Sequence, residues 1–456
     1  MATATTEPVR LPPRLRMPKA VQGIVWLAAK REMFSALSRR WGGAFTLNLP
    51  VMGQTVIVSD PTLYKDVYSA STDLIERPID LLTLGELFGP GSTFSLVGAQ
   101  HLARRRLLTP PFRGKRMRSY EHLVEDEVLR EIANWPEGRE FETLAPMLRI
   151  TLGAILRAVF GAEKAALDEL RDLLPSLVAL GCRLIMVPPI MRRDFGGWSP
   201  GGRYLQYRRR FDAVIDSLIA DARADAAFEE RGDVLALLLR ARDENGEPIP
   251  DRHIADELLT FVAAGHETTA SQLAWILERL RRHPHLLSRL ADEVDAGGSA
   301  LRQATIFEAQ RMRSVADGSV RRTNKRIRLG QWVIPEYTTV LVYNELAHMS
   351  EEIFPDATSF DPDRFVAASP PPHVWVPFGG GVNRCPGASF ATMEMDVTLR
   401  TLLREFRFAP TDARGERPHN DGIVWVPARR ARAVVYRRPN SASSDAGSVS
   451  AANRGN

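Results

Sequence analysis

Ten residues near the carboxyl end of the chain constrain its fold more than any other stretch. They run from Phe378 to Gly387 and read Phe-Gly-Gly-Gly-Val-Asn-Arg-Cys-Pro-Gly. Three consecutive glycines allow turns that a Cβ atom would forbid, and they let the backbone lie close to a flat partner. From Ala388 to Phe406 good helix formers follow, with apolar residues at helical spacing. Cys385 is therefore predicted where a loop enters a helix, and the N–H groups there favour a thiolate.

Taken alone, a cysteine near such a turn is more often a small buried hydrophobe. The full string, however, resembles the haem-binding loop of the cytochromes P450, in which Phe, Gly, Gly and Cys recur at the positions of Phe378, Gly379, Gly381 and Cys385. A thiolate is a suitable axial ligand for iron. The resemblance implies that Cys385 ligates the iron of haem b (iron protoporphyrin IX) and that the other three residues, with Arg384, contact the cofactor.

A second motif interrupts a long apolar helical run predicted over residues 251–283. The centre of that run reads Ala264, Gly265, His266, Glu267, Thr268 and Thr269. Glycine, an acid and adjacent threonines conflict with a buried helix, and such conflicts tend to mark function. A zinc protease is excluded because Ala270 stands where a second histidine is required. The bland alternative is a kink at which Thr268 bonds back to the preceding turn.

Within the resemblance, this stretch matches the oxygen-activating helix of the P450 family. Ala264 and Gly265 are then expected beside the haem. Glu267 and Thr268 are expected to be the catalytic pair that supplies protons to bound dioxygen, since a general acid within reach can do so.

A basic stretch provides candidates for the haem propionates. His101 and Arg105 lie four apart, so they would share one helix face. Alone, the stretch is better explained by a solvated basic helix start. The resemblance assigns both residues to the propionates, and a planar guanidinium can bind a carboxylate through two hydrogen bonds. Arg321, in a region predicted as short strands between positions 321 and 343, is a further candidate contact.

Glu308 and Arg311 lie three apart on another predicted helix. Alone they would form a surface ion pair of little energetic weight. The stretch around Arg364 lies where the family has its second arginine motif. The resemblance therefore implies a buried triad of Glu308, Arg311 and Arg364 that supports the cysteine loop.

Composition and the ends of the chain complete the expectations. The 456 residues carry a net charge of +5, with 25% charged residues and no long Lys/Arg block, so nucleic acid is not an expected partner. Two cysteines fit a reducing compartment, and the cytoplasm is expected. The N-terminal region lacks an apolar run long enough to span a membrane. A flexible segment is expected over residues 1–19, a single P450 domain over 20–439 and a disordered tail over 440–456.

Two positions depart from the family pattern. Asn383, two residues before the cysteine, stands where the family usually has Arg or His gripping a propionate, and asparagine carries no charge. Ser314 stands where proline is usual after the helix of Arg311, which affects the expected chain path there but not the haem.

The resemblance covers about residues 20–437 and implies a mainly α fold with small β-sheets and a long central helix over the haem. The implied activity is insertion of one atom of dioxygen into a small hydrophobic substrate by a monomer that receives electrons from a separate ferredoxin-type protein. Two alternatives remain, a haem-binding carrier or sensor and a peroxide-dependent haem-thiolate enzyme. The acid–threonine pair favours the monooxygenase over both.

Overall fold

The computed structural model describes residues 1–78, 84–112, 114, 116–161, 165–185, 187, 189–243 and 246–439. The tail predicted over 440–456 lies outside this part. The longer helices are α1 (Lys19–Trp41), α2 (Pro61–Tyr68), α5 (Gly98–Leu108), α6 (Arg116–Ile132), α7 (Leu144–Phe160), α8 (Ala165–Ile185), α9 (Pro200–Ala224), α10 (Val234–Arg240), α11 (Asp251–Leu280), α12 (Pro284–Asp295), α13 (Ala300–Met312) and α15 (Ala388–Glu405). Shorter ones are α4 (Leu84–Phe88), α14 (Asn344–His348) and the 3₁₀ turns η1 (Pro110–Phe112), η2 (Pro189–Arg192), η3 (Phe228–Glu230), η4 (Pro362–Phe365) and η5 (Gly381–Asn383).

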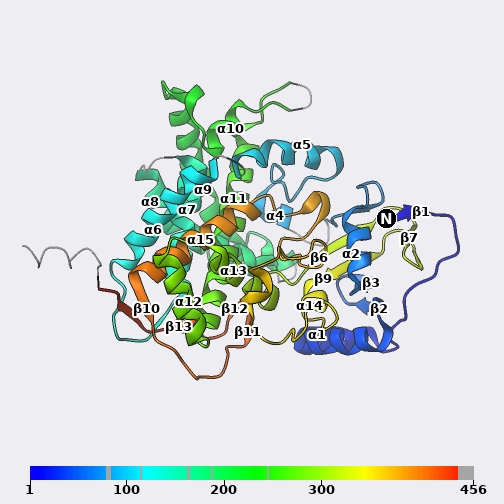
Figure 1. The fold of residues 1–456 in the computed structure, drawn as a ribbon. Helices are drawn as coiled ribbons and strands as arrows, with labels where there is room; N and C mark the ends of the chain where they lie inside the picture. Colours follow the sequence, from blue (N-terminus) through cyan, green and yellow to red (C-terminus); the bar gives the residue numbers. More distant parts are fainter. Residues whose placement is uncertain are drawn as a thin grey trace, which may run out of the picture.

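The strands are short and form five small sheets. They are β1 (Thr3–Ala4), β2 (Ala44–Leu49), β3 (Gly53–Val58), β4 (Ile75–Glu76), β5 (Phe141–Glu142), β6 (Gly318–Thr323), β7 (Ile327–Leu329), β8 (Trp332–Ile334), β9 (Thr339–Tyr343), β10 (Phe406–Phe408), β11 (Pro418–Asp421), β12 (Val424–Pro427), β13 (Arg432–Ala433) and β14 (Val435–Arg437). The molecule is thus mainly helical with small sheets, as predicted. Most helices gather on one side in Figure 1, and the largest sheet lies on the other beside α1 and α2.

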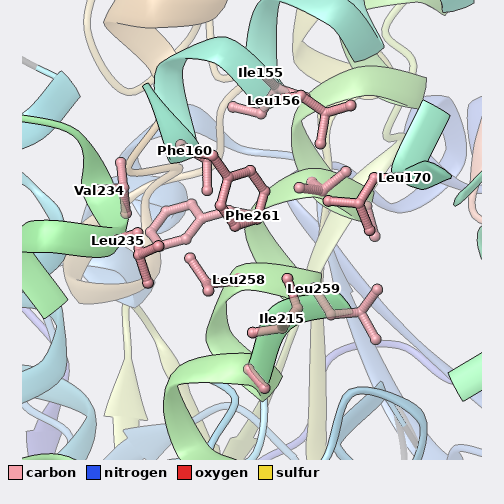
Figure 2. Close-up of a cluster of buried hydrophobic side chains, with 14 of the residues drawn as sticks. Ile155, Leu156, Phe160, Leu170, Ile215, Val234, Leu235, Leu258, Leu259 and Phe261 are labelled. Carbon is pink, nitrogen blue, oxygen red and sulfur yellow. The ribbon is translucent and has the colours of Figure 1, made fainter. Parts of the chain in front are cut away.

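Helix α11 runs through the middle of the helical part, as the apolar run predicted. Its face at Leu258, Leu259 and Phe261 packs in an apolar cluster with side chains from α7, α8, α9 and α10 (Figure 2). A helix that buries apolar side chains on nearly all sides is held by tertiary packing rather than by propensity. Any polar group on it is therefore placed with little freedom.

The largest sheet has the strand order β2-β3-β9-β6-β4. The hairpin of β2 and β3 is its outer part, with Ala44 paired to Val58 and Leu49 to Gly53. At the other edge β4 runs antiparallel to β6, and Glu76 pairs with Arg322. Arg77 follows directly after the end of β4.

The first 18 residues, expected to be flexible, run along the sheets in this structure. Strand β1 pairs with β7 through Thr3 and Arg328. Further on, Arg10 exchanges backbone hydrogen bonds with Val333 at 3.0 and 2.9 Å. The segment is therefore hydrogen-bonded to the sheets before α1 begins.

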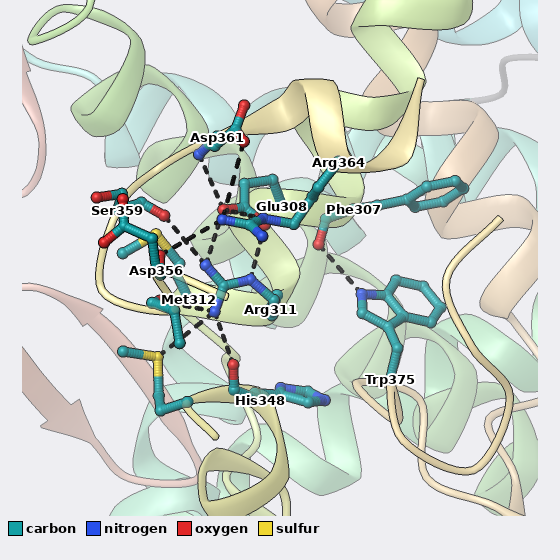
Figure 3. A network of polar contacts seen from close by, with 12 residues as sticks. Phe307, Glu308, Arg311, Met312, His348, Asp356, Ser359, Asp361, Arg364 and Trp375 are labelled. Atoms are coloured by element: carbon teal, nitrogen blue, oxygen red, sulfur yellow. Dashed lines mark hydrogen bonds and ion pairs between the residues drawn. The ribbon is translucent and has the colours of Figure 1, made fainter. Parts of the chain in front are cut away.

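The predicted triad is confirmed at the junction of α13 and η4. Glu308 accepts from Arg311 Nε at 2.7 Å and from Arg364 Nε at 3.3 Å (Figure 3). The Arg311 guanidinium also donates to the carbonyl oxygens of His348, Ala357 and Ser359. With both Glu308 oxygens included, its five contacts to oxygen equal the number of its N–H donors. We call these three residues the Glu308 network.

Candidate functional site

The loop that carries the cysteine is closed by its own backbone. Cys385 N–H donates to the Phe378 carbonyl at 2.9 Å, and Gly379 N–H donates to the carbonyl of Val376 at 3.0 Å. Gly379 and Gly381 have φ values of 64° and 65°, in the left-handed region that favours glycine. Cys385 lies three residues before α15, as predicted, and the exposed Arg384 precedes it.

The glycines also allow the loop to lie directly on the end of α2. A Cβ atom at Gly381 would lie 2.1 Å from the carbonyl oxygen of Tyr68, and one at Gly380 would lie 2.5 Å from the Tyr68 ring. Neither position has room for a side chain. On the other side, Trp375 packs against Phe378 with ring centroids 6.2 Å apart. The path of the loop is therefore fixed on both sides.

Burial opposes ionisation of the cysteine. It raises the pKa of the Cys385 thiol, while the Gly387 N–H and the charges of Arg105 and Arg384 lower it and only partly offset burial. The N–H groups at the helix start thus act in the expected direction, towards the thiolate, but burial outweighs them. A bound metal cation would supply the positive charge that deprotonates a coordinating thiol.

Four basic residues, two of them buried and two half-buried, form a group on the side of Arg105, whose charge acts on this thiol. We call Arg77, His101, Arg105 and Arg321 the cation cluster. The pKa of His101 is lowered to about 4, first by burial and then by the charges of the three arginines. The pKa of Arg77 is lowered to about 10 by burial and by Arg321 and Arg105. Burial also lowers the pKa of Arg321.

Part of this cluster forms no ion pair, although the charge of Glu76 acts on both Arg77 and Arg321. Among the described residues, no carboxylate forms an ion pair with Arg77 or Arg321. The Arg77 guanidinium donates instead to the carbonyls of Thr93 and Leu96, and Arg321 donates weakly to the Gly380 carbonyl at 3.4 Å. Arg77 Nε and His101 Nδ1 are buried without a hydrogen-bond partner. Buried charges are normally paired, so the cluster is complementary to an anionic ligand.

Haem fits this arrangement. Its two propionates would supply carboxylates to Arg77 and Arg321, which form no ion pair within the described residues. Its iron would bind the thiol of Cys385. Asn383 adds a buried Oδ1 atom without a partner. An oxygen atom cannot donate to a propionate, but the amide nitrogen of Asn383 can.

Arg77 was missed by the sequence reasoning. It follows β4 at the start of an irregular stretch, and no local motif marks it. It directly follows Glu76, which the pairing of β4 with β6 fixes opposite Arg322, and the charge of Arg321 acts on it.

The centre of α11 has a short accessible stretch at Ala264 and Thr268, which we call the step of α11. Ala264 is exposed and Thr268 is half-buried, whereas Val262, Ala263 and His266 are buried. Thr268 Oγ1 donates to the Ala264 carbonyl at 2.8 Å, which is the contact of the bland alternative. The oxygen of such a hydroxyl can still accept a hydrogen bond from the accessible side.

Gly265 serves helix packing here. A Cβ atom at Gly265 would lie 3.2 Å from Ile155 of α7. Thr151 of the same helix donates to the His266 carbonyl at 3.0 Å. The glycine therefore lets α7 approach α11 closely at the step that carries Ala264.

Glu267 points away from this step towards α8. Its Oε2 lies 3.5 Å from Cys182 Sγ. Burial raises the pKa of Glu267 to about 7, which the contact with Cys182 lowers and the charge of Asp421 raises. A carboxyl group with such a pKa can both release and take up protons near neutral pH. Thr268 and this acid are adjacent in sequence but face different surroundings.

Comparison with known proteins adds independent findings. The family model described as Cytochrome P450 matches residues 12–431. The provisionally named cytochrome P450 138 of Mycobacterium tuberculosis is 48% identical over 441 residues, which covers 96% of this chain and 99% of the relative. The provisionally named cytochrome P450 135B1 of the same species is 35% identical over 442 residues, with 94% and 92% covered.

Solved structures have the same fold. The retinoic-acid-bound cyanobacterial CYP120A1 matches with a TM-score of 0.80 at 20% identity, over 94% of this chain and 100% of that one. The haem domain of cytochrome P450DA matches with a TM-score of 0.82 at 22% identity, over 95% and 98%. None of the helices in the described ranges is long and apolar enough to cross a membrane. With a family model that spans most of its length and relatives aligned over nearly all of it, this chain belongs to the cytochrome P450 family.

Proposed function

We propose that this protein is a haem-thiolate monooxygenase that inserts one atom of dioxygen into a small hydrophobic substrate. The observation that carries the proposal is the cation cluster beside Cys385, in which Arg77 and Arg321 lack carboxylate partners. Such a cluster is costly to bury unless a ligand brings the missing negative charge. A haem with two propionates brings that charge and an iron that binds the thiolate.

The haem, once bound, would supply the redox chemistry by which dioxygen is activated. Cys385 would hold the iron from one side. His101, Arg77, Arg105 and Arg321 would bind the propionates and orient the ring.

The accessible step of α11 would handle protons. Thr268 Oγ1 can accept a hydrogen bond from a water while its own O–H donates to the Ala264 carbonyl. Glu267, whose pKa is raised to about 7 by burial, would restock the proton from a cavity behind the helix. A carrier or sensor does not need a proton-exchanging acid beside the haem, so the presence of Glu267 with this pKa favours the enzyme.

Electrons would come from a separate ferredoxin-type donor, and the arginine-rich composition suits an acidic partner. We place the protein in the cytoplasm, because Cys182 and Cys385 are both free thiols. We further infer that it acts as a monomer.

The test is turnover with a surrogate ferredoxin pair and NADPH. Thr268→Ala is expected to keep folding, haem content and substrate binding. It should still consume NADPH but release peroxide instead of product, because the hydroxyl that holds the water is gone. Glu267→Gln should slow oxygen-dependent turnover without blocking the first electron. Full coupling in Thr268→Ala would remove the proton relay.

Two controls separate the alternatives. Cys385→Ser should abolish the red-shifted Soret band of the reduced CO complex, whereas Cys182→Ser should keep it. A ferrous–CO complex without any turnover of a compound library would support a carrier or sensor. Product formation with peroxide alone, equally in Thr268→Ala, would support the peroxide-dependent enzyme.

A further inference from the structure

A cavity of about 940 Å³ lies behind the central helix, between α6, α7, α8, α11 and the hairpin of β11 and β12. From α11 it is lined by His266, Glu267 and Ser271, and from the hairpin by Asp421. The acid of the proposed relay therefore faces a polar space rather than the packed core. Proton exchange with solvent can occur through such a space.

Cys182 stands at the edge of this cavity and makes one polar contact. It comes from the last turns of α8 and is 5% exposed. Its Sγ lies 3.5 Å from Glu267 Oε2. Burial raises the pKa of the Cys182 thiol, and the charge of Glu267 raises it further. The thiol therefore keeps its proton and is the donor in this contact.

Among the described residues, Glu267 is the hydrogen-bond acceptor of this thiol. On one side Cys182 belongs to the apolar cluster of α7, α8, α9 and α11. On the other, the turn between β11 and β12 closes on it at Gly422. That glycine has a φ of 82°, and a Cβ atom there would lie 2.8 Å from Cys182 Cβ. The hairpin thus fixes Cys182 against Glu267.

We propose that Cys182 is a positioning residue for Glu267, holding Oε2 by a thiol hydrogen bond so that Oε1 stays available to the cavity. The sequence analysis gave this cysteine no role beyond packing. The inference rests on the proposed function, since it concerns the acid of the proposed proton relay.

The electrostatic surroundings set the direction of the expected effect. The charged groups that line the cavity come from four elements and the loop after β12. They are Glu127, Arg130 and Glu131 of α6, Arg149 of α7, Asp168, Arg171, Asp172 and Arg183 of α8, Asp421 of β11, and Arg430. Arg430 pairs with Asp421 at 2.7 Å, which limits the repulsion between Asp421 and Glu267.

The thiol contact therefore lowers a pKa that burial and Asp421 raise. Loss of the donor should move the pKa of Glu267 upward. A neutral hydrogen bond contributes about 1 kcal/mol, which corresponds to a shift of about half to one pH unit.

The experiment is an infrared pH titration of the carbonyl stretch of protonated Glu267 in the purified holoprotein, assigned by its loss in Glu267→Gln. Three variants separate the hydrogen bond from packing. Cys182→Ser keeps a donor, Cys182→Ala removes it, and Cys182→Val removes it while filling the space. We expect wild type and Cys182→Ser to titrate together, with Cys182→Ala and Cys182→Val both shifted upward.

A Cys182→Val protein that titrates like wild type would reduce the role of Cys182 to packing and overturn the inference. A shift of the same size in Cys182→Ser would overturn it as well. The Val and Ser variants keep the test open if the Ala variant is too unstable to purify.

Coupling measurements then tell the two proposals apart. If Thr268→Ala and Glu267→Gln lose product per NADPH and Cys182→Val does so partly, both stand. If the first two stay fully coupled, the proton relay fails, and the infrared titration still decides whether Cys182 orients the carboxyl group. If only Cys182→Val is coupled as in wild type, with no carbonyl shift, only the role of Cys182 fails.

Discussion

Two groups of arginines differ in whether carboxylates of the chain pair with them, and this difference distinguishes a structural role from a ligand-binding role. In the Glu308 network, Arg311 is fully buried and makes five contacts to oxygen, two of them to a carboxylate. In the cation cluster, Arg321 is buried and Arg77 half-buried, and within the described part of the chain both donate to backbone carbonyls rather than to carboxylates. The first group is complete within the chain. In the second, Arg77 and Arg321 have no carboxylate as an ion-pair partner within the described residues, and we take this as an indication of an anionic ligand.

The comparison predicts its largest effect at Glu308. Glu308→Ala should lower the free energy of unfolding by about 3–5 kcal/mol, because it leaves the Arg311 charge buried and uncompensated. Urea or thermal unfolding of the purified protein measures this. The matched control is Glu352→Ala, which removes an exposed acid nearby and should change stability by less than about 0.5 kcal/mol. A small loss in Glu308→Ala would mean that the network is not needed for stability.

His101 offers a pH test of the cation cluster. Its pKa is lowered to about 4 in the folded protein, so the unfolded chain binds more protons between its ordinary value of 6.5 and about 4. Stability of the haem-free protein should therefore fall as the pH falls through this window, by at most about 2 kcal/mol from this group after screening. His101→Gln should remove that part of the slope. Bound haem should reduce the slope too, since propionates favour the charged imidazole. Equal slopes in wild type and variant would place His101 outside the cluster.

How much of this could be read from the sequence differs between the two groups. The Glu308 network was predicted because two of its members share a helix and the third lies in a recognisable stretch. His101, Arg105 and Arg321 were named from the resemblance. Arg77 was not predicted, because its position depends on the pairing of β4 with β6, and these strands are more than two hundred residues apart in the sequence.

The central helix α11 shows the same limit of local sequence signals. The long apolar run predicted α11 and its polar step, because helical periodicity is a local signal. It did not predict that Glu267 would meet Cys182, which lies on another helix. Nor did it predict that Gly265 would pack against Ile155. Contacts between elements need the tertiary structure.

Arg321→Met sharpens the comparison through the sign of its effect. Without haem, removal of a buried cation that lacks a carboxylate should leave stability unchanged or raise it by about 1 kcal/mol. With haem, the variant should lose the cofactor faster, as transfer to apomyoglobin can measure. Arg311→Met is the matched contrast and should destabilise both forms. If Arg321→Met destabilised the haem-free protein as strongly, Arg321 would be a structural residue.

The smallest effect is expected at Asn383. Asn383→Arg would add a cation where this chain has a neutral amide, and a charge-assisted hydrogen bond to a propionate is stronger than a neutral one. Haem loss should slow about two- to fivefold, for a gain of less than about 1 kcal/mol. Asn383→Ala serves as the reference for loss of the amide. Faster loss in Asn383→Arg than in Asn383→Ala would mean that the added charge does not reach the propionate.

The close contact between Gly381 and Tyr68 has a consequence for how the protein is assembled. The two residues are separated by most of the chain, so the backbone that places the cysteine becomes ordered only when the first seventy residues have docked. Joining such distant segments is slow because the entropic cost of closing the loop must be met before the contact forms. We therefore regard cofactor capture as a late event in folding. Docking of the amino-terminal region would then control cofactor capture. A chain in which that region has not docked would lack the surface of Tyr68 against which the loop of Cys385 packs.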